Sequence, residues 1–111
     1  MRYSMQGFRA AIQYEAAFRQ ELMLAAVLFP CAFWVGQTAA QIALLIASLF
    51  LVLIIELLNS AVETLADAVS LEANPMIGRA KDLGSAAVML TLVVSLLVWL
   101  ILLVNRLHPF L

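Results

Sequence analysis

Long apolar runs, separated by short polar interruptions, dominate the pattern of this chain. Residues 22–55 contain no charged side chain, and the polar stretch 36–41 (GQTAAQ) divides this run into two segments. A second uncharged run covers residues 83–105. A helix needs about 20 apolar residues to cross a bilayer, and polar stretches with glycine favour turns. The pattern therefore predicts three transmembrane helices, at about residues 20–36, 41–68 and 81–104.

The segments outside these runs have a mixed pattern. Near the amino terminus, apolar Phe8, Ile12 and Phe18 are interspersed with charged residues, as in helices that lie at the headgroup level. We therefore expect an amphipathic surface helix at about residues 3–18. The connection 69–80 contains Asn74-Pro75 and Gly78, which predict a break and a turn there.

Composition agrees with a membrane location. Hydrophobic residues make up 66% of the 111 residues and charged residues 12%, against about 45–50% and about 25% in soluble domains. The chain is therefore expected to be an all-α integral membrane protein with a single domain, residues 1–111. Its net charge of −1 gives no indication of nucleic-acid binding.

The basic residues predict the orientation. Five of the six lie before the first predicted span or in the connection between the second and third, and only Arg106 follows the third span. Because Lys and Arg accumulate on the cytoplasmic side of membrane proteins, we expect the amino terminus and the 69–80 connection to be cytoplasmic.

A line of polar groups crosses the second predicted span. At about 100° per residue they share one helix face: Glu56, Asn59, Ser60, Glu63 and Asp67. Ionisable residues inside a span are costly, about 2.5–3.5 kcal/mol each on insertion scales, so they indicate a functional site.

Depth separates these carboxylates. Measured from Ile42, Glu56 lies about 21 Å and Glu63 about 31 Å along the helix, against a hydrocarbon core of about 30 Å. Glu56, the less hydrated of the two, therefore suits a general base, and Glu63 suits a metal ion that carries phosphates. Together with Glu15 and with Lys81-Asp82, which project to the same level, they fit Mg²⁺-assisted phosphoryl transfer.

Three blocks carry a resemblance to a known family. Residues 15–21 (EAAFRQE), 56–63 (ELLNSAVE) and 78–88 (GRAKDLGSAAV) resemble the signature of the small integral-membrane diacylglycerol kinases of bacteria, and the resemblance runs from about residue 3 to residue 99. Members of that family are homotrimers of three-span protomers with a surface helix. They transfer the γ-phosphoryl group of ATP to diacylglycerol and so produce phosphatidic acid, which implies a bacterial inner-membrane location for this chain.

The resemblance also implies roles for individual residues. Glu56 would be the general base, and Glu15 and Glu63 would hold Mg²⁺. The expected contacts to ATP are Tyr3, Glu15, Asn59, Glu63, Glu72, Ala73, Asn74, Lys81 and Asp82. The expected contacts to the lipid substrate are Ala17, Phe18, Arg19, Gln20, Glu21, Glu56, Ser85 and Trp99. A trimer agrees with the physics, because packing of protomers keeps so many polar groups away from lipid tails.

Other interpretations remain open for these residues. Glu56 could be a structural hydrogen-bonding residue at a helix interface, and Lys81 a residue that sets topology. Glu15 and Arg19 could form an i, i+4 surface pair. Trp34 and Trp99 could be interface anchors.

Two other functions are also compatible with the pattern. A related bacterial activity phosphorylates undecaprenol, although the wording of the first and third blocks favours diacylglycerol. Small proton-coupled transporters have similar length, but typically have four spans and a carboxylate near the midplane, whereas this chain has three predicted spans and a carboxylate cluster at one end.

Overall fold

The computed structural model describes residues 1–69 and 75–111, and within these residues the chain is helical with no strand. The helices are α1 (Arg2–Tyr14), α2 (Ala16–Val35), α3 (Ala39–Val69), α4 (Pro75–Leu107) and the short 3-10 helix η1 (His108–Phe110). The expectation of an all-α fold is confirmed.

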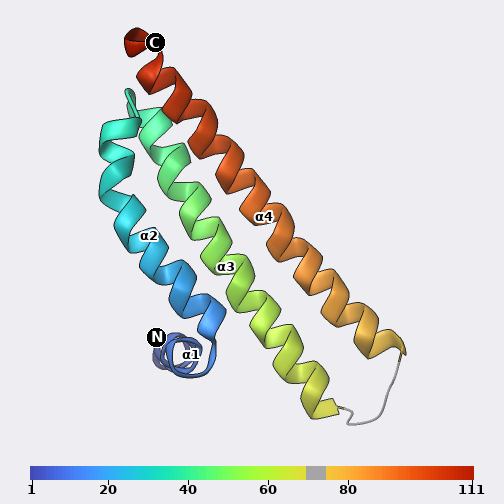
Figure 1. Ribbon diagram of the computed structural model, residues 1–111. Helices are drawn as coiled ribbons and strands as arrows, with labels where there is room; N and C mark the ends of the chain where they lie inside the picture. The colour runs from blue at the N-terminus through green and yellow to red at the C-terminus, as the bar shows by residue number, and fades with distance from the viewer. Residues whose placement is uncertain (70–74) are drawn as a thin grey trace.

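Three long helices run side by side, and α1 lies across one end of them (Figure 1). The central helix is α3, which packs along both α2 and α4, whereas α2 and α4 have few contacts with each other. The molecule is long and thin, with extents of 57 × 32 × 20 Å. We call the end that carries α1, Asp67 and Lys81 the charged end, and the end that carries residues 36–38 and the carboxyl terminus the far end.

The helices α2 and α3 and the segment that begins at Pro75 are each long and apolar enough to cross a membrane, which confirms the prediction of three such helices. At 1.5 Å per residue, the 31 residues of α3 extend about 46 Å and the 33 residues of α4 about 50 Å. Both lengths exceed the hydrocarbon core of about 30 Å, so the ends of these helices reach beyond it.

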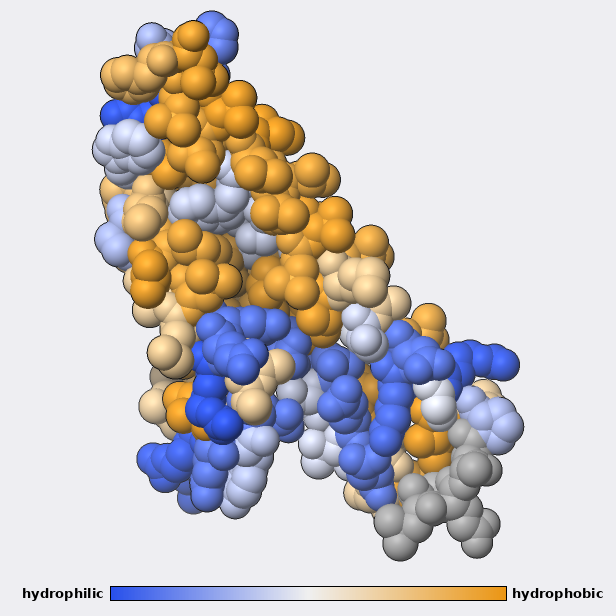
Figure 2. Space-filling model, in the orientation of Figure 1, coloured by the Kyte–Doolittle hydropathy of each residue, from blue (hydrophilic) through white to orange (hydrophobic). Residues whose placement is uncertain are grey.

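The surface of the three helices agrees with a lipid environment. Apolar side chains cover the long part of the molecule, and hydrophilic side chains gather at the charged end (Figure 2). Many of the apolar residues are more than half exposed, among them Leu97, Ile101 and Val104. Water-soluble monomers rarely expose such a continuous apolar surface, so it is expected to face lipid or another copy of the chain.

Two small clusters hold the helices together. Near the charged end, Phe18 of α2, 2% exposed, packs with Ala11 and Leu53. Near the far end, Ala32, Val35 and Leu45 form a second cluster. Between them, the Ser95 hydroxyl donates to Ser48 Oγ across 3.3 Å and links α4 to α3. The thin core means that few buried contacts fix the arrangement within one chain.

The connection between α2 and α3 is short, and its geometry follows from its residues. A side chain at Gly36 would have its Cβ 2.6 Å from Ile42 Cγ1, so only glycine fits there without movement. Thr38 Oγ1 accepts a hydrogen bond from the backbone N–H of Gln41 at 3.1 Å, which caps the start of α3. The turn therefore occupies residues 36–38, and α3 begins at Ala39 rather than at 41.

The amino-terminal helix is shorter than the predicted 3–18. It ends at Tyr14, because Glu15 takes an extended conformation (φ −112°, ψ 102°) and α2 begins at Ala16. The Arg19 guanidinium Nη1 donates to the carbonyl oxygens of Ile12 at 2.9 Å and of Gln13 at 3.2 Å. Arg19 thus satisfies the last carbonyls of α1 and stabilises the corner.

The predicted connection, residues 69–80, extends too far towards the carboxyl terminus, since residues 75–80 are helical and residues 70–74 lie outside the described part of the chain. Pro75 is the first residue of α4, and Gly78, Arg79 and Ala80 are helical. Proline suits the first helical position because its φ is already fixed and its missing N–H would have no partner there. A side chain at Gly78 would meet nothing within 4 Å, so this glycine does not mark a close approach.

Candidate active site

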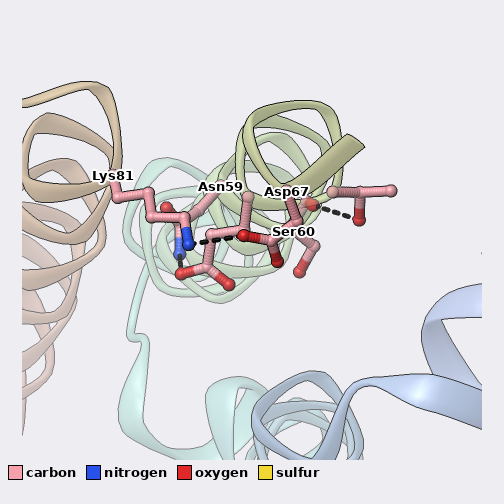
Figure 3. Close-up of polar contacts among 6 residues, drawn as sticks. Asn59, Ser60, Asp67 and Lys81 are labelled. Carbon is pink, nitrogen blue, oxygen red and sulfur yellow. Dashed lines mark hydrogen bonds and ion pairs between the residues drawn. The ribbon is translucent and has the colours of Figure 1, made fainter. Parts of the chain in front are cut away.

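The polar face of α3 lies near the charged end and is graded in exposure. Glu56 is buried, with 6% of its surface exposed, and Ser60 is also buried. Asn59 and Glu63 are half-buried, whereas the side chain of Asp67 is 66% exposed. Asn59 and Asp67 lie on the side of α3 that Lys81 approaches (Figure 3). The polar face thus extends from the interior of the bundle to the exposed surface of the charged end.

One ion pair joins this face to α4. Lys81 Nζ lies 2.5 Å from Asp67 Oδ1. This is the one ion pair found between residues of the described ranges, 1–69 and 75–111. Figure 3 shows Lys81 reaching from α4 to the α3 face. The side chain of Lys81 is 42% exposed, so the pair is open to solvent and to ligands.

Asn59 lies between α4 and Glu63, which is a predicted metal ligand. Its Nδ2 donates to Glu63 Oε1 at 3.3 Å, while its Oδ1 is buried and has no hydrogen-bond partner. The nearest part of α4 is Gly84, where a Cβ would overlap Asn59 Oδ1. Gly84 therefore allows α4 to approach Asn59 closely, a role that its spacing from Lys81 could have indicated, since residues i and i+3 share a helix face.

Four carboxylates converge on this region from three places in the chain. Glu56 lies within electrostatic range of Glu63 on its own helix and of Glu15 at the corner between α1 and α2. Glu21 on α2 lies within range of Glu56, and its Oε2 is buried without a hydrogen-bond partner. Both predicted metal ligands and one predicted lipid contact thus lie within electrostatic range of the predicted base.

Glu63 and Asn59 offer oxygen atoms of the kind that hard cations bind. Mg²⁺ takes oxygen ligands, usually one or two carboxylates together with water and substrate phosphates. Glu63 supplies a carboxylate oxygen, and the unpartnered Oδ1 of Asn59 shows a second oxygen nearby that has no bond within the protein. No group of three or more His, Cys, Asp or Glu side chains forms a closed metal cage in the described part of the chain. An open site of this kind would need phosphate oxygens to complete the metal shell.

An apolar groove of about 890 Å³ lies between α1 and α3, and of the four carboxylates Glu15 lines it. Its walls include Phe8, Ala11 and Tyr14 from α1 and Leu57, Ala61 and Leu65 from α3. Glu15 and Ser60 are polar residues in its lining. A groove with apolar walls and a carboxylate can hold a molecule that has hydrocarbon chains and a polar headgroup.

Several predicted site residues lie elsewhere or make structural contacts. Phe18 belongs to the core and Arg19 caps α1, as described above. Ala17, Gln20, Asp82 and Ser85 are exposed, and Tyr3 is exposed with Arg2 stacked on its ring at 5.4 Å. Glu72, Ala73 and Asn74 fall outside the described residues.

Trp99 is the most distant of the predicted lipid contacts. It packs against the far-end cluster and its Nε1 is buried without an acceptor. Because Ser95 pairs with Ser48, Trp99 lies about 12 residues from the level of Glu56, or about 18 Å along the helices. Within one chain, Trp99 and Glu56 therefore do not contact the same headgroup.

Comparison with known proteins gives a consistent result. The family model for prokaryotic diacylglycerol kinase matches residues 2–103. A diacylglycerol kinase of Pseudomonas aeruginosa is 50% identical over 97 residues, which cover 87% of this chain and 79% of the relative. The diacylglycerol kinase of Escherichia coli K12 is 48% identical over 103 residues (91% and 83%), and that of Haemophilus influenzae is 47% identical over 98 residues (88% and 83%).

Proposed function

Since the chain belongs to the family of prokaryotic diacylglycerol kinases, we propose that it transfers the γ-phosphoryl group of ATP, with Mg²⁺, to the hydroxyl of 1,2-diacylglycerol and produces phosphatidic acid. The observation that carries this proposal is that Glu56 lies within electrostatic range of both Glu15 and Glu63 at the charged end, where Glu15 also lines an apolar groove. A lipid alcohol and a water-soluble nucleotide can both reach such a position.

Glu56 is proposed as the general base. In the transfer, the oxygen of the lipid hydroxyl forms a bond to the γ-phosphorus while the bond from that phosphorus to the β–γ bridging oxygen breaks. ADP leaves with the electron pair of the broken bond, and the Glu56 carboxylate accepts the proton of the hydroxyl. Burial of Glu56 supports this role, because its carboxylate is withdrawn from bulk water.

Glu15 and Glu63 are proposed to hold Mg²⁺, which neutralises phosphate charge during transfer. Asn59 positions Glu63 through its hydrogen bond. Lys81 and Asp82 contact the phosphates or sugar of the nucleotide, and Tyr3, Glu72, Ala73 and Asn74 line its adenosine end. Because Lys81 is paired with Asp67 in the free protein, nucleotide binding would exchange an exposed carboxylate for phosphate oxygens.

The diacylglycerol is proposed to place its acyl chains along the groove between α1 and α3. Its headgroup would then lie near Glu56, bordered by residues of the first turns of α2, Ala17, Phe18, Arg19, Gln20 and Glu21. Ser85 and Trp99 would border the lipid as well, with Trp99 beside the acyl chains rather than the headgroup, since it lies about 18 Å from the level of Glu56. A homotrimer is part of the proposal, and the exposed apolar faces of the helices support it.

The charged end is proposed to face the cytoplasm of the bacterium, with the chain in the inner membrane. Four basic residues, Arg2, Arg9, Arg19 and Lys81, lie in helices that meet at this end, and Arg79 lies in the first turns of α4. This distribution is the one expected of cytoplasmic ends. ATP is then available on the side where the carboxylates lie.

The decisive experiment is ATP-dependent labelling of lipid by the purified protein in mixed micelles. Dioleoylglycerol and undecaprenol are supplied separately, each with and without Mg²⁺, and Glu56→Gln protein serves as the control. We expect labelled phosphatidic acid as the main product, and only with Mg²⁺. Undecaprenyl phosphate as the main product would assign the sister activity instead. No product from either lipid would contradict a kinase and favour the transporter alternative.

A further inference from the structure

A second cluster of functional groups lies at the far end, about as far from the carboxylates as the chain extends. Trp34 is in the last turn of α2 and Arg106 in the last turn of α4, and both helices end there (Figure 1). Arg106 Cζ lies 4.9 Å from the centre of the Trp34 ring, within the range of a cation–π contact. Arg106 also lies beyond residues 2–103, so the family match does not include it.

The position of the guanidinium is fixed by its neighbours. Asn105 Nδ2 donates to Gln37 Oε1 at 3.1 Å, which ties the end of α4 to the turn between α2 and α3. Gln37 is held in turn, since its backbone N–H donates to Gln41 Oε1 at 2.9 Å. Arg106 is therefore presented by a braced segment on one side and by the Trp34 ring on the other.

The charge of Arg106 has no Asp or Glu partner in its half of the molecule. The sequence contains neither residue in 22–55 or 83–111, so a second, parallel copy of the chain would not supply one at this level either. Arg106 Nε is buried and has no acceptor. A guanidinium presents N–H donors in a planar fork that matches two oxygens of a phosphate, and stacking on an aromatic ring leaves that fork free.

The depth of Arg106 in the membrane indicates which kind of phosphate it can contact. Arg106 follows Lys81 by 25 residues of helix, about 37 Å along the axis, whereas the hydrocarbon core is about 30 Å thick. When Lys81 is at one membrane surface, Arg106 is therefore at the headgroups of the other, where tryptophan also concentrates. The abundant anion at that level is the phosphate of a phospholipid.

We propose that Arg106 and Trp34 form a binding site for the phosphate of an anionic phospholipid, in the leaflet opposite the carboxylate cluster. An anionic headgroup such as phosphatidylglycerol is favoured over a zwitterionic one, because the latter carries its own ammonium group to neutralise the phosphate. The site is separate from the proposed kinase reaction, and its occupancy is expected to fix the ends of α2 and α4 in place.

The test uses the purified protein, in nanodiscs that contain phosphatidylcholine alone or with one fifth phosphatidylglycerol. Lipid that stays bound after transfer to neutral detergent is counted by native mass spectrometry. We expect preferential retention of phosphatidylglycerol by the wild type, and about fivefold less retention by Arg106→Gln, the effect of one basic residue at an anionic surface. Arg79→Gln, at the other end of the same helix, is the matched control and should retain the lipid.

Two further arms keep the result interpretable. A photoactivatable phosphatidylglycerol should crosslink to peptides that contain Trp34 or Arg106 in the wild type, which needs no variant to fold. Inorganic phosphate in neutral detergent should raise the unfolding temperature much less than phosphatidylglycerol does. Equal retention by the wild type and Arg106→Gln, crosslinks only at the charged end, or equal protection by free phosphate would each overturn the proposal.

Discussion

Gly84 of α4 lies directly against the side chain of Asn59 of α3, at the place where a Cβ atom would overlap the amide oxygen. The same amide donates through Nδ2 to Glu63. The spacing of two helices and the orientation of a proposed metal ligand therefore depend on the absence of one methyl group.

Gly84→Ala should disturb both. The added methyl must either displace α4 or rotate Asn59 away from Glu63, and overpacking of this kind costs about 1–3 kcal/mol. We expect a lower unfolding temperature and a higher Mg²⁺ concentration at half-maximal activity. Gly78→Ala is the matched control: its Cβ meets nothing within 4 Å, so the better helix former should slightly raise stability. An unchanged Mg²⁺ requirement in Gly84→Ala would show that Asn59 does not position Glu63.

Glu56→Gln tests the base. The amide keeps the size of the buried side chain but cannot accept the hydroxyl proton, so turnover should fall by at least about 100-fold. Binding of ATP, measured by equilibrium dialysis or fluorescence, should persist. Near-normal turnover would mean that Glu56 is a structural residue of the helix interface.

Glu63→Gln tests the metal ligand. Loss of the carboxylate should weaken Mg-ATP binding by at least about tenfold, since removal of even an outer partner of a metal ligand has that effect. The measurement is activity as a function of Mg²⁺ at fixed ATP, with replacement by Mn²⁺ as a second readout. If kcat falls while the Mg²⁺ dependence stays as in the wild type, Glu63 acts in another way.

Lys81→Gln tests whether Lys81 binds the nucleotide or only forms a structural ion pair with Asp67. An exposed ion pair contributes about 0–1 kcal/mol, so loss of the contact with Asp67 should change the unfolding temperature little. Loss of a contact to phosphate should raise KM for ATP by about tenfold or more. Asp67→Asn, which removes the same ion pair but keeps the lysine, is the control. Equal KM values in the two variants would favour a structural role for Lys81.

Arg19→Gln tests the corner between α1 and α2. The variant loses the donors to the Ile12 and Gln13 carbonyls, and we expect a loss of about 1 kcal/mol together with faster proteolysis within α1. Arg9→Gln on the exposed side of α1 should leave both properties near wild type. If Arg19→Gln keeps full stability but raises KM for the lipid, the proposed substrate contact outweighs the cap.

The sequence predicts the long helices well because the bilayer imposes their length and polarity. The uncharged runs before Glu56 and after Asp82 leave little choice of structure. The corner at Glu15 is different, because residues 9–21 (RAAIQYEAAFRQE) contain good helix formers on both sides of the break. What ends α1 is a contact from Arg19 to carbonyls six and seven residues earlier, which no local pattern reveals.

The polar face of α3 could also be predicted from the sequence, since its residues recur with helical spacing. The approach of Glu21 to Glu56, and of Gly84 to Asn59, depends on how helices pack and could not be read from one segment. At Pro75 the error had another source, since proline breaks a helix from within but opens one at its first position.

The three-residue connection at 36–38 also has a consequence for biosynthesis. Of the three spans, α2 is the least apolar, and it follows a charged, amphipathic segment, so by itself it is a weak signal for membrane insertion. The link between α2 and α3 is so short that one helix cannot remain in water while the other inserts into the membrane. We expect the translocon to release α2 and α3 together, as a preformed hairpin, before α4 is synthesised and packs against α3.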